Sequence, residues 1–235
     1  MTQVVMGEQL FDELVSAIRR RIPGFKIRYK NKSIWQKIIG KLCFFNRGYM
    51  TDYTSTYGDT VWYPSRKFLE ESYKRAFKIL AHEYVHLLDR KKYPIIFELF
   101  YVMPQVFTLL SLFSILALFF SDLFLLFSAA LLFALPAPSL GRAVIEMRGY
   151  AMNIAINMWR HGSVTSETMT AILKEFTGLS YYRMWPNKKD VEKWMEESIA
   201  RIRNIDSIKR DDETILGDSD AYADVYDLLT GIEEE

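Results

Sequence analysis

The stretch that decides the fold is Ala81-His82-Glu83-Tyr84-Val85-His86, which contains the pattern H-E-x-x-H. On a helix, positions four apart lie one turn apart on one face, so His82 and His86 can direct two imidazole nitrogens at one Zn²⁺ ion. Glu83 sits about 100° around the helix from His82, where it can hold a water beside the metal without being a ligand. The chain has three histidines, and two of them lie in this motif. The less favoured alternative is a pair of histidines that cap or pack on an ordinary helix.

The residues around the motif predict a single helix from Arg66 to about Lys92. Ser65 is placed to cap its start, no Gly or Pro interrupts it, and Pro94 stops it. Asp89 continues the face that carries the two histidines. Two interpretations of its carboxylate stay open: it orients a histidine, or it is a solvated charge.

Length and composition exclude several classes of protein. At 235 residues the chain can hold one full domain and something extra, and half of its residues are hydrophobic. The net charge of +1 argues against a nucleic-acid partner. Cys43 is the single cysteine, which excludes an internal disulfide and a thiolate zinc cluster, and we expect it to be buried. The first 20 residues show no signal peptide.

The hydrophobic residues concentrate in residues 94–140. Leu99–Ser121 and Leu123–Leu140 carry no charge over 23 and 18 residues, or ~34 Å and ~27 Å of helix against a hydrocarbon core of ~30 Å. Ser121-Asp122 lies between them as a hairpin tip. We therefore expect a membrane hairpin that contacts the lipid bilayer. The alternatives are a buried helical pair in a soluble protein and, because the second segment contains two prolines, a tilted or re-entrant hairpin.

The charges on either side of the hairpin predict its orientation. Arg90, Lys91 and Lys92 precede it and Arg142 and Arg148 follow it, whereas the tip has no Lys or Arg. The positive-inside rule then puts both flanks, and the active site, in the cytoplasm of an integral membrane protein. A hairpin also returns the chain to the side it left, so residues after 140 can meet the histidine helix.

A catalytic zinc site needs a third protein ligand and an open position. Glu146 is the best candidate, two turns into a helix that Ser139 can cap. On its position alone Glu146 would be a solvated charge paired with Arg142, four residues earlier. Glu98 and His161 are weaker candidates for the ligand. Tyr150, which shares the face of Glu146, is a candidate donor to an oxyanion or an aromatic residue at the membrane interface, and both stay open.

We expect an α+β fold: a zincin-like domain with a small N-terminal β-sheet and the H-E-x-x-H helix, interrupted by a transmembrane helical hairpin and followed by a helical C-terminal part. The sheet is expected from a strand at Phe25–Lys30 and a hairpin of Met50–Tyr57 with Thr60–Tyr63. The expected divisions are residues 1–93 (first half of the zincin-like domain), 94–140 (hairpin), 141–210 (glutamate helix and C-terminal helices) and 211–235 (an acidic tail that docks on the body or stays flexible).

The order of H-E-x-x-H helix, two hydrophobic spans and a helix carrying a glutamate resembles the integral-membrane gluzincin peptidases, which include the prenyl-protein (CAAX) peptidase and the heat-shock-linked bacterial membrane peptidase. The resemblance covers roughly residues 60–160. It implies His82, His86 and Glu146 as zinc ligands and Glu83 as base. The sequence departs from that family at Val85, where the family usually has Gly, and at Gly149-Tyr150, where it has an Ala-Asp pair.

Two functions follow as hypotheses. The leading one is a membrane-anchored zinc endopeptidase that hydrolyses polypeptide substrates with metal-activated water. The alternative is a non-catalytic zincin-fold membrane protein with a structural or assembly role, which coordination by Asp89 or Glu98 as a fourth ligand would favour. A second copy of the chain or another membrane protein stays open as a partner. A pore or transporter is disfavoured, because the two spans contain no ionisable residue apart from Asp122 at the tip.

Overall fold

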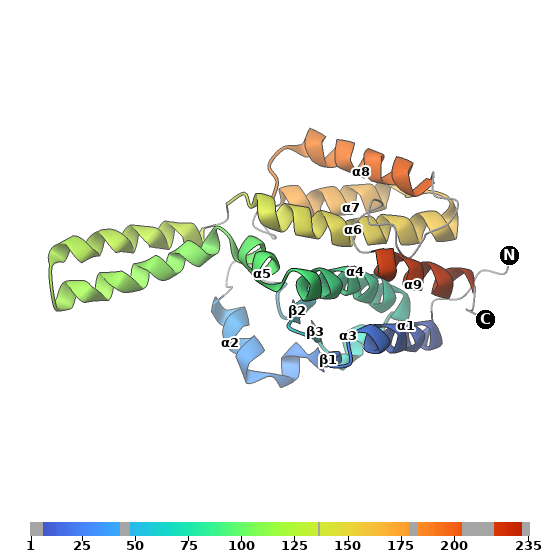
Figure 1. Cartoon of the computed structure of the whole chain (residues 1–235), viewed down its shortest axis with the longest axis horizontal. Coiled ribbons are helices and arrows are strands. Elements are labelled where there is room, and N and C mark those ends of the chain that lie inside the picture. Colours follow the sequence, from blue (N-terminus) through green and yellow to red (C-terminus); the bar gives the residue numbers. More distant parts are fainter. Residues whose placement is uncertain (1–6, 43–47, 136, 179–182, 204–218, 232–235) are drawn as a thin grey trace.

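The computed structural model describes residues 7–42, 48–135, 137–178, 183–203 and 219–231. It is a mostly helical α+β body with a small mixed sheet and a helical hairpin that projects from one end (Figure 1). The α-helices are α1 (Glu8–Arg21), α2 (Ile34–Leu42), α3 (Arg66–Glu70), α4 (Tyr73–Lys92), α5 (Pro94–Val102), α6 (Leu140–His161), α7 (Ser166–Thr177), α8 (Lys188–Arg203) and α9 (Ser219–Thr230). The 3₁₀ helices are η1 (Lys30–Lys32), η2 (Gln105–Leu118) and η3 (Asp122–Ala134), and the strands are β1 (Lys26–Tyr29), β2 (Ser55–Tyr57) and β3 (Thr60–Tyr63).

The sheet has the order β1-β3-β2, with β3 parallel to β1 and antiparallel to β2. The predicted turn between β2 and β3 is confirmed, and Gly58 there has a φ of +54° that favours glycine. The predicted strand at residues 50–57 is confirmed only for its last three residues. The reason is the buried Lys30, whose Nζ donates to the backbone oxygens of Tyr49 and Tyr53, both at 2.8 Å, and so holds the preceding segment in turns.

The prediction of one unbroken helix from Arg66 to Lys92 is wrong at its second turn, where α3 ends and α4 begins. Ser65 caps α3 as predicted, its Oγ accepting from the amide of Phe68 at 3.0 Å. Ser72 caps α4 in the same way, accepting from the amide of Arg75 at 3.3 Å. A serine inside a helical pattern can therefore start a new helix, because its hydroxyl satisfies one of the first amides of that new helix.

The hydrophobic hairpin consists of η2 and η3, which pack against each other along their length (Figure 1). Its tip is at Ser121-Asp122 as predicted, with Ser121 Oγ accepting from the amide of Leu123 at 3.3 Å. The first uncharged stretch, Leu99–Ser121, is not one continuous helix, because the chain bends by 77° between α5 and η2. Pro104 lies at this bend and has no amide to donate to a continuing helix. No single described helix is long and apolar enough to cross a membrane, although α5 and η2 together have the required length and composition.

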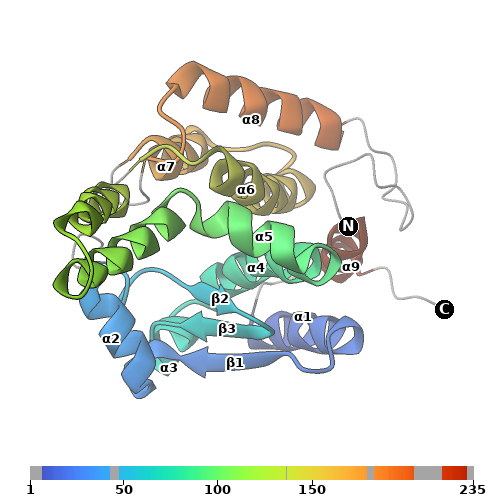
Figure 2. The same cartoon turned by 60° about the vertical axis from the view of Figure 1, so that its left-hand side comes forward.

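The body is built around α4, which packs against α6, α1 and α9 (Figure 2). The acidic C-terminal part was expected either to dock or to stay flexible, and its described segment, α9, docks. Tyr222 and Val225 of α9 are buried in the core cluster. Cys43 lies outside the described residues, as does much of the rest of the acidic tail.

The base of the hairpin is tied to the start of α6. Ser139, which caps α6 as predicted, also donates its hydroxyl to the carbonyl of Met103 at 2.6 Å. Arg142 donates to the carbonyl of Tyr101 at 2.9 Å and to Oε1 of Gln105 at 2.8 Å. These contacts hold the two ends of the hairpin together where the chain re-enters the body.

Candidate metal centre

The expected metal ligands come together where α4 and α6 pack on each other. His82, His86 and Glu146 are all buried, and they form a group that could hold a metal ion. The Nε2 atoms of the two histidines are 2.9 Å apart. Oε2 of Glu146 lies 3.3 Å from Nε2 of His82 and 3.7 Å from Nε2 of His86. Three ligand atoms from two helices therefore converge on one point.

These separations are those of ligands around a small cation. Imidazole and carboxylate ligands bind zinc at about 2.0–2.2 Å in tetrahedral geometry, which places ligand atoms about 3.3 Å from one another. The observed distances of 2.9, 3.3 and 3.7 Å lie around that value. The residues thus fit a metal ion without a change of backbone.

The charge state of Glu146 suits a cation. The residue is 2% exposed, so the alternative of a solvated charge is wrong. Burial acts to raise its pKa, but hydrogen bonds from His82 and His86 outweigh burial and hold the pKa of Glu146 well below its usual range. For His86, burial lowers the pKa and the contacts with Glu146 raise it, with a net rise. Arg142, the partner that the sequence offered for Glu146, donates to the hairpin base.

The next turn of α6 shapes the space around His82. A Cβ at Gly149 would lie 2.5 Å from Nε2 of His82, so this position accommodates the imidazole only because it is glycine. The ring of Tyr150 stands edge-on to His82 at 4.8 Å between centroids, and the ring of Phe176 lies 5.5 Å from that of Tyr150. Burial and the negative charge of Glu146 raise the pKa of Tyr150 well above its usual value. Tyr150 therefore keeps its phenolic proton beside the metal centre.

Asn153 lies against the far nitrogen of His82. Its Nδ2 is 3.5 Å from Nδ1 of His82, and its Oδ1 is buried without a hydrogen-bond partner among the described residues. The oxygen and nitrogen of an amide are assigned from their surroundings, and turning this amide by 180° directs Oδ1 at the histidine. Oδ1 then accepts from Nδ1–H, which leaves the Nε2 lone pair of His82 facing the metal ligands.

The other candidate ligands are engaged elsewhere. Asp89 is buried and paired with Arg148, whose Nε lies 2.7 Å from Oδ2 and whose Nη2 contacts Oδ1, so it is neither solvated nor the partner of a histidine. Oε1 of Glu98 lies 2.7 Å from Nε of Arg90. His161 is exposed at the last position of α6, as expected for a residue that interacts with the helix dipole.

Glu83 is the partly exposed acidic residue of the motif. Thr56 of β2 donates its hydroxyl to Oε2 of Glu83 at 2.5 Å. β2 is an edge strand of the sheet, so the contact with Thr56 brings the carboxylate of Glu83 to that edge. The structure thus fixes one carboxylate oxygen of Glu83 and orients the group beside the metal centre.

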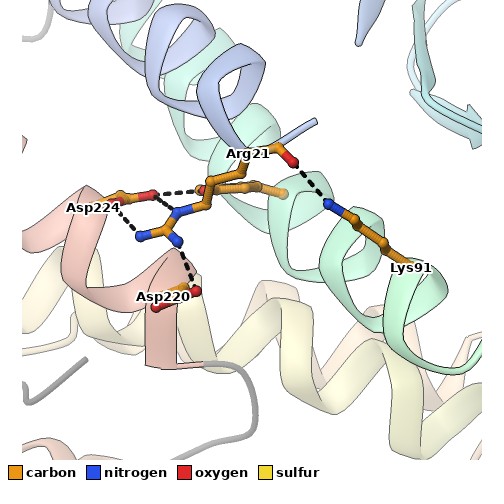
Figure 3. A network of polar contacts seen from close by, with 5 residues as sticks. Arg21, Lys91, Asp220 and Asp224 are labelled. Carbon is orange, nitrogen blue, oxygen red and sulfur yellow. Dashed lines mark hydrogen bonds and ion pairs between the residues drawn. The ribbon is translucent and has the colours of Figure 1, made fainter. Parts of the chain in front are cut away.

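Tyr84, the third residue of the motif, joins α4 to α9. Its hydroxyl donates to Oδ2 of Asp224 in α9 at 2.6 Å. Figure 3 shows Arg21 of α1 between Asp220 and Asp224, with Nη1 2.7 Å from Asp220 and Nε 2.7 Å from Asp224. Lys91 of α4 donates to the carbonyl of Arg21 at 2.8 Å. Hydrogen bonds and ion pairs therefore connect α1, α4 and α9 to one another.

Sequence reasoning missed two residues of the site. Asn153 follows Glu146 by seven positions, which is two helical turns on the same face, so its spacing was a usable signal. Thr56 gave no such signal, because its contact with Glu83 joins residues that are distant in the chain and depends on where β2 packs.

No family model matches the chain, and no curated protein or solved structure matches it either.

Proposed function

We propose that the chain is a membrane-anchored zinc endopeptidase with a zincin-like fold, similar in plan to the integral-membrane gluzincin peptidases, and with its active site on the cytoplasmic side. One observation carries the proposal: His82, His86 and Glu146 converge on one point with the partly exposed Glu83 next to them. Three protein ligands beside an acidic residue are the arrangement of catalytic zinc sites, which keep one position open.

Each residue then has a role in peptide hydrolysis. His82, His86 and Glu146 would hold zinc, which supplies Lewis acidity that acidifies water and polarises a carbonyl. Glu83, held by Thr56, accepts a proton from the attacking water at its carboxylate and delivers it to the leaving amine. Tyr150, which keeps its proton, donates a hydrogen bond to the developing oxyanion.

The length and surface of the hairpin support a membrane anchor. Its arms have 14 and 13 residues in 3₁₀ helices, or ~28 Å and ~26 Å at ~2.0 Å per residue, close to a hydrocarbon core of ~30 Å. Large apolar side chains cover its surface, with Leu118 and Phe120 near the tip exposed by 80% and 75%. The Lys and Arg residues at its base favour a cytoplasmic position for both flanks.

A non-catalytic role for the metal would call for a fourth protein ligand to close the site. Asp89 and Glu98, the candidates for that position, are paired with Arg148 and Arg90. The described residues that could share a metal ion number three, which favours the catalytic role.

The test compares zinc content and cleavage of an unfolded protein substrate by detergent-purified variants. Glu83→Gln should keep about one zinc per chain and lose cleavage, because it removes the base and leaves the ligands. Glu146→Ala should lose zinc and cleavage together. Glu98→Gln is the matched control, a carboxylate outside the metal centre, and should keep both. Undiminished proteolysis by the Glu83→Gln variant would rule out the mechanism.

A further inference from the structure

Helix α2 (Ile34–Leu42) turns apolar side chains to solvent and a polar one to the body of the protein. Ile34, Trp35 and Ile38 are 74%, 75% and 43% exposed, whereas Gln36 is 3% exposed. At 100° per residue, the three apolar side chains fall within an arc of about 100°. The surface helix of a soluble protein normally has the opposite arrangement, with its apolar stripe towards the core.

The orientation of α2 is fixed by its inner face. Gln36 accepts a hydrogen bond from the hydroxyl of Tyr49 at 2.7 Å. Four residues later, a Cβ at Gly40 would lie 2.8 Å from Cγ of Met50, so the helix packs on this segment through a glycine. Rolling α2 to bury its isoleucines would break both contacts. The outward apolar arc is thus a feature built into the fold.

The chain segment that carries this arc is rich in basic residues. Residues 25–51 contain seven Lys and Arg and no Asp or Glu, although the whole chain has a net charge of only +1. Lys32, Lys37 and Lys41 are exposed, and the last two lie one turn apart on a flank of the apolar arc. Lysines in such positions extend their charged ends beyond an apolar surface while their stems cover it.

Both views of the molecule put α2 at the end of the body from which the hairpin projects, beside the hairpin base (Figures 1 and 2). A membrane that contains the hairpin would therefore pass close to α2. The cytoplasmic leaflet carries anionic lipids, which attract basic segments and so match the charge of this region.

We propose that α2 binds the surface of an anionic bilayer, with Ile34, Trp35 and Ile38 at the boundary between headgroups and acyl chains and the three lysines on lipid phosphates. Tryptophan is enriched at this depth, and short amphipathic helices with basic flanks lie in the same plane. The inference rests on the membrane anchor of the proposed function and adds a second contact. Together the hairpin and α2 would fix the orientation of the metal centre relative to the membrane.

The test measures depth in proteoliposomes of the full chain. In a Cys43→Ser background, a fluorophore is attached at Ile34→Cys in α2, at Leu112→Cys in the hairpin or at Glu196→Cys on the exposed face of α8. Quenching by lipids with a nitroxide near the headgroup or deep in the acyl chain is compared in vesicles of phosphatidylcholine alone and with phosphatidylglycerol. We expect shallow quenching at position 34 with anionic lipid, deep quenching at position 112, and none at position 196.

The matched variant removes the positive charges beside the apolar arc. Replacing Lys32, Lys37 and Lys41 by glutamine should shift the bound equilibrium of α2 by a factor on the order of 100, since each lysine near an anionic surface contributes about fivefold. The quenching at position 34 should fall while that at position 112 stays. Equal quenching at position 34 in both lipid mixtures would overturn the role of the lysines.

Two other outcomes would overturn the proposal as a whole. If position 34 behaves like position 196 while position 112 is quenched, α2 does not bind lipid and the hairpin anchor stands. If position 34 is shielded from water without any quenching by lipid, a protein surface such as a second copy of the chain covers α2. Absence of quenching at position 112 would instead overturn the membrane anchor of the proposed function.

Discussion

Replacing Gly149 by alanine should disrupt the metal centre through one methyl group. Its Cβ would lie 2.5, 2.6 and 2.8 Å from Nε2, Cε1 and Cδ2 of His82, whereas carbon atoms pack at about 3.5–4.0 Å. The imidazole must therefore move by about 1 Å. Metal–ligand distances hold within about 0.2 Å, so a shift of this size removes His82 from coordination.

The expected sizes of the two effects distinguish a loss of zinc binding from a loss of stability. Alanine favours a helix interior by about 0.5–1 kcal/mol over glycine, and overpacking costs about 1–3 kcal/mol. The two effects largely offset each other, so the metal-free protein should lose about 1 kcal/mol of unfolding free energy. Loss of a residue that only orients a ligand weakens metal binding about 10–100-fold. Displacing the ligand itself should weaken zinc binding by more than about 100-fold.

The assay is a competition titration with a zinc chelator, beside a urea titration of the metal-free protein. Gly141→Ala is the matched control on the same helix, because its Cβ would lie 2.8 Å from Cβ of Phe100, away from the ligands. The control should lose at least as much stability, because its Cβ would also lie 3.0 Å from the backbone Cα of Phe100, and it should keep its zinc affinity. A Gly149→Ala variant that binds zinc as tightly as the parent would refute the close packing of His82 on Gly149 as a condition for coordination.

Three further changes test the surroundings of the centre. Asn153→Ala should weaken zinc binding about 10–100-fold in the same titration, while Asn153→Asp keeps it, because an acceptor for Nδ1–H of His82 is lost only in the first; equal affinities would exclude that role. Tyr84→Phe should lower the free energy of unfolding in urea by about 1–2 kcal/mol, because Asp224 loses one charged hydrogen bond and keeps Arg21. Burial and the charge of Glu146 raise the pKa of Glu175 above its ordinary value of 4.5, so its contribution to stability is present below that pH and is lost as the pH rises through the folded-state pKa. Glu175→Gln should therefore have a higher thermal midpoint than the parent at pH 7 but not near pH 4, and an equal difference at both would contradict this linkage.

Local features of the chain were readable from sequence. His82 and His86 share a face because helical periodicity alone puts them there. Ser65 and Ser139 cap helices because a hydroxyl before a helical run satisfies its first amides, wherever that helix packs. The expected position of Glu146 in the metal centre followed from those local rules and from the return of the chain after the hairpin.

The predictions that were wrong concern residues whose partners are distant in the chain. The strand expected at residues 50–57 is shortened because the amine of Lys30 takes two of its neighbouring carbonyls, and no local pattern encodes that contact. Asp89 was expected to be solvated or to orient a histidine, yet it pairs with Arg148 of α6. Such contacts appear only when two helices are packed at a specific register.

The hairpin and the metal centre form one structural unit. Closing a longer loop costs only about 0.6 kcal/mol for each doubling of its length, so a long insertion between His86 and Glu146 is tolerated if its ends meet. Arg142 makes them meet by donating to the carbonyl of Tyr101 and the side chain of Gln105. Arg142 lies one helical turn before Glu146, so the two ends of the hairpin meet one turn away from the candidate third ligand. The hydrophobic insertion therefore does not interrupt the site, because the chain returns to the body next to the helix that carries Glu146.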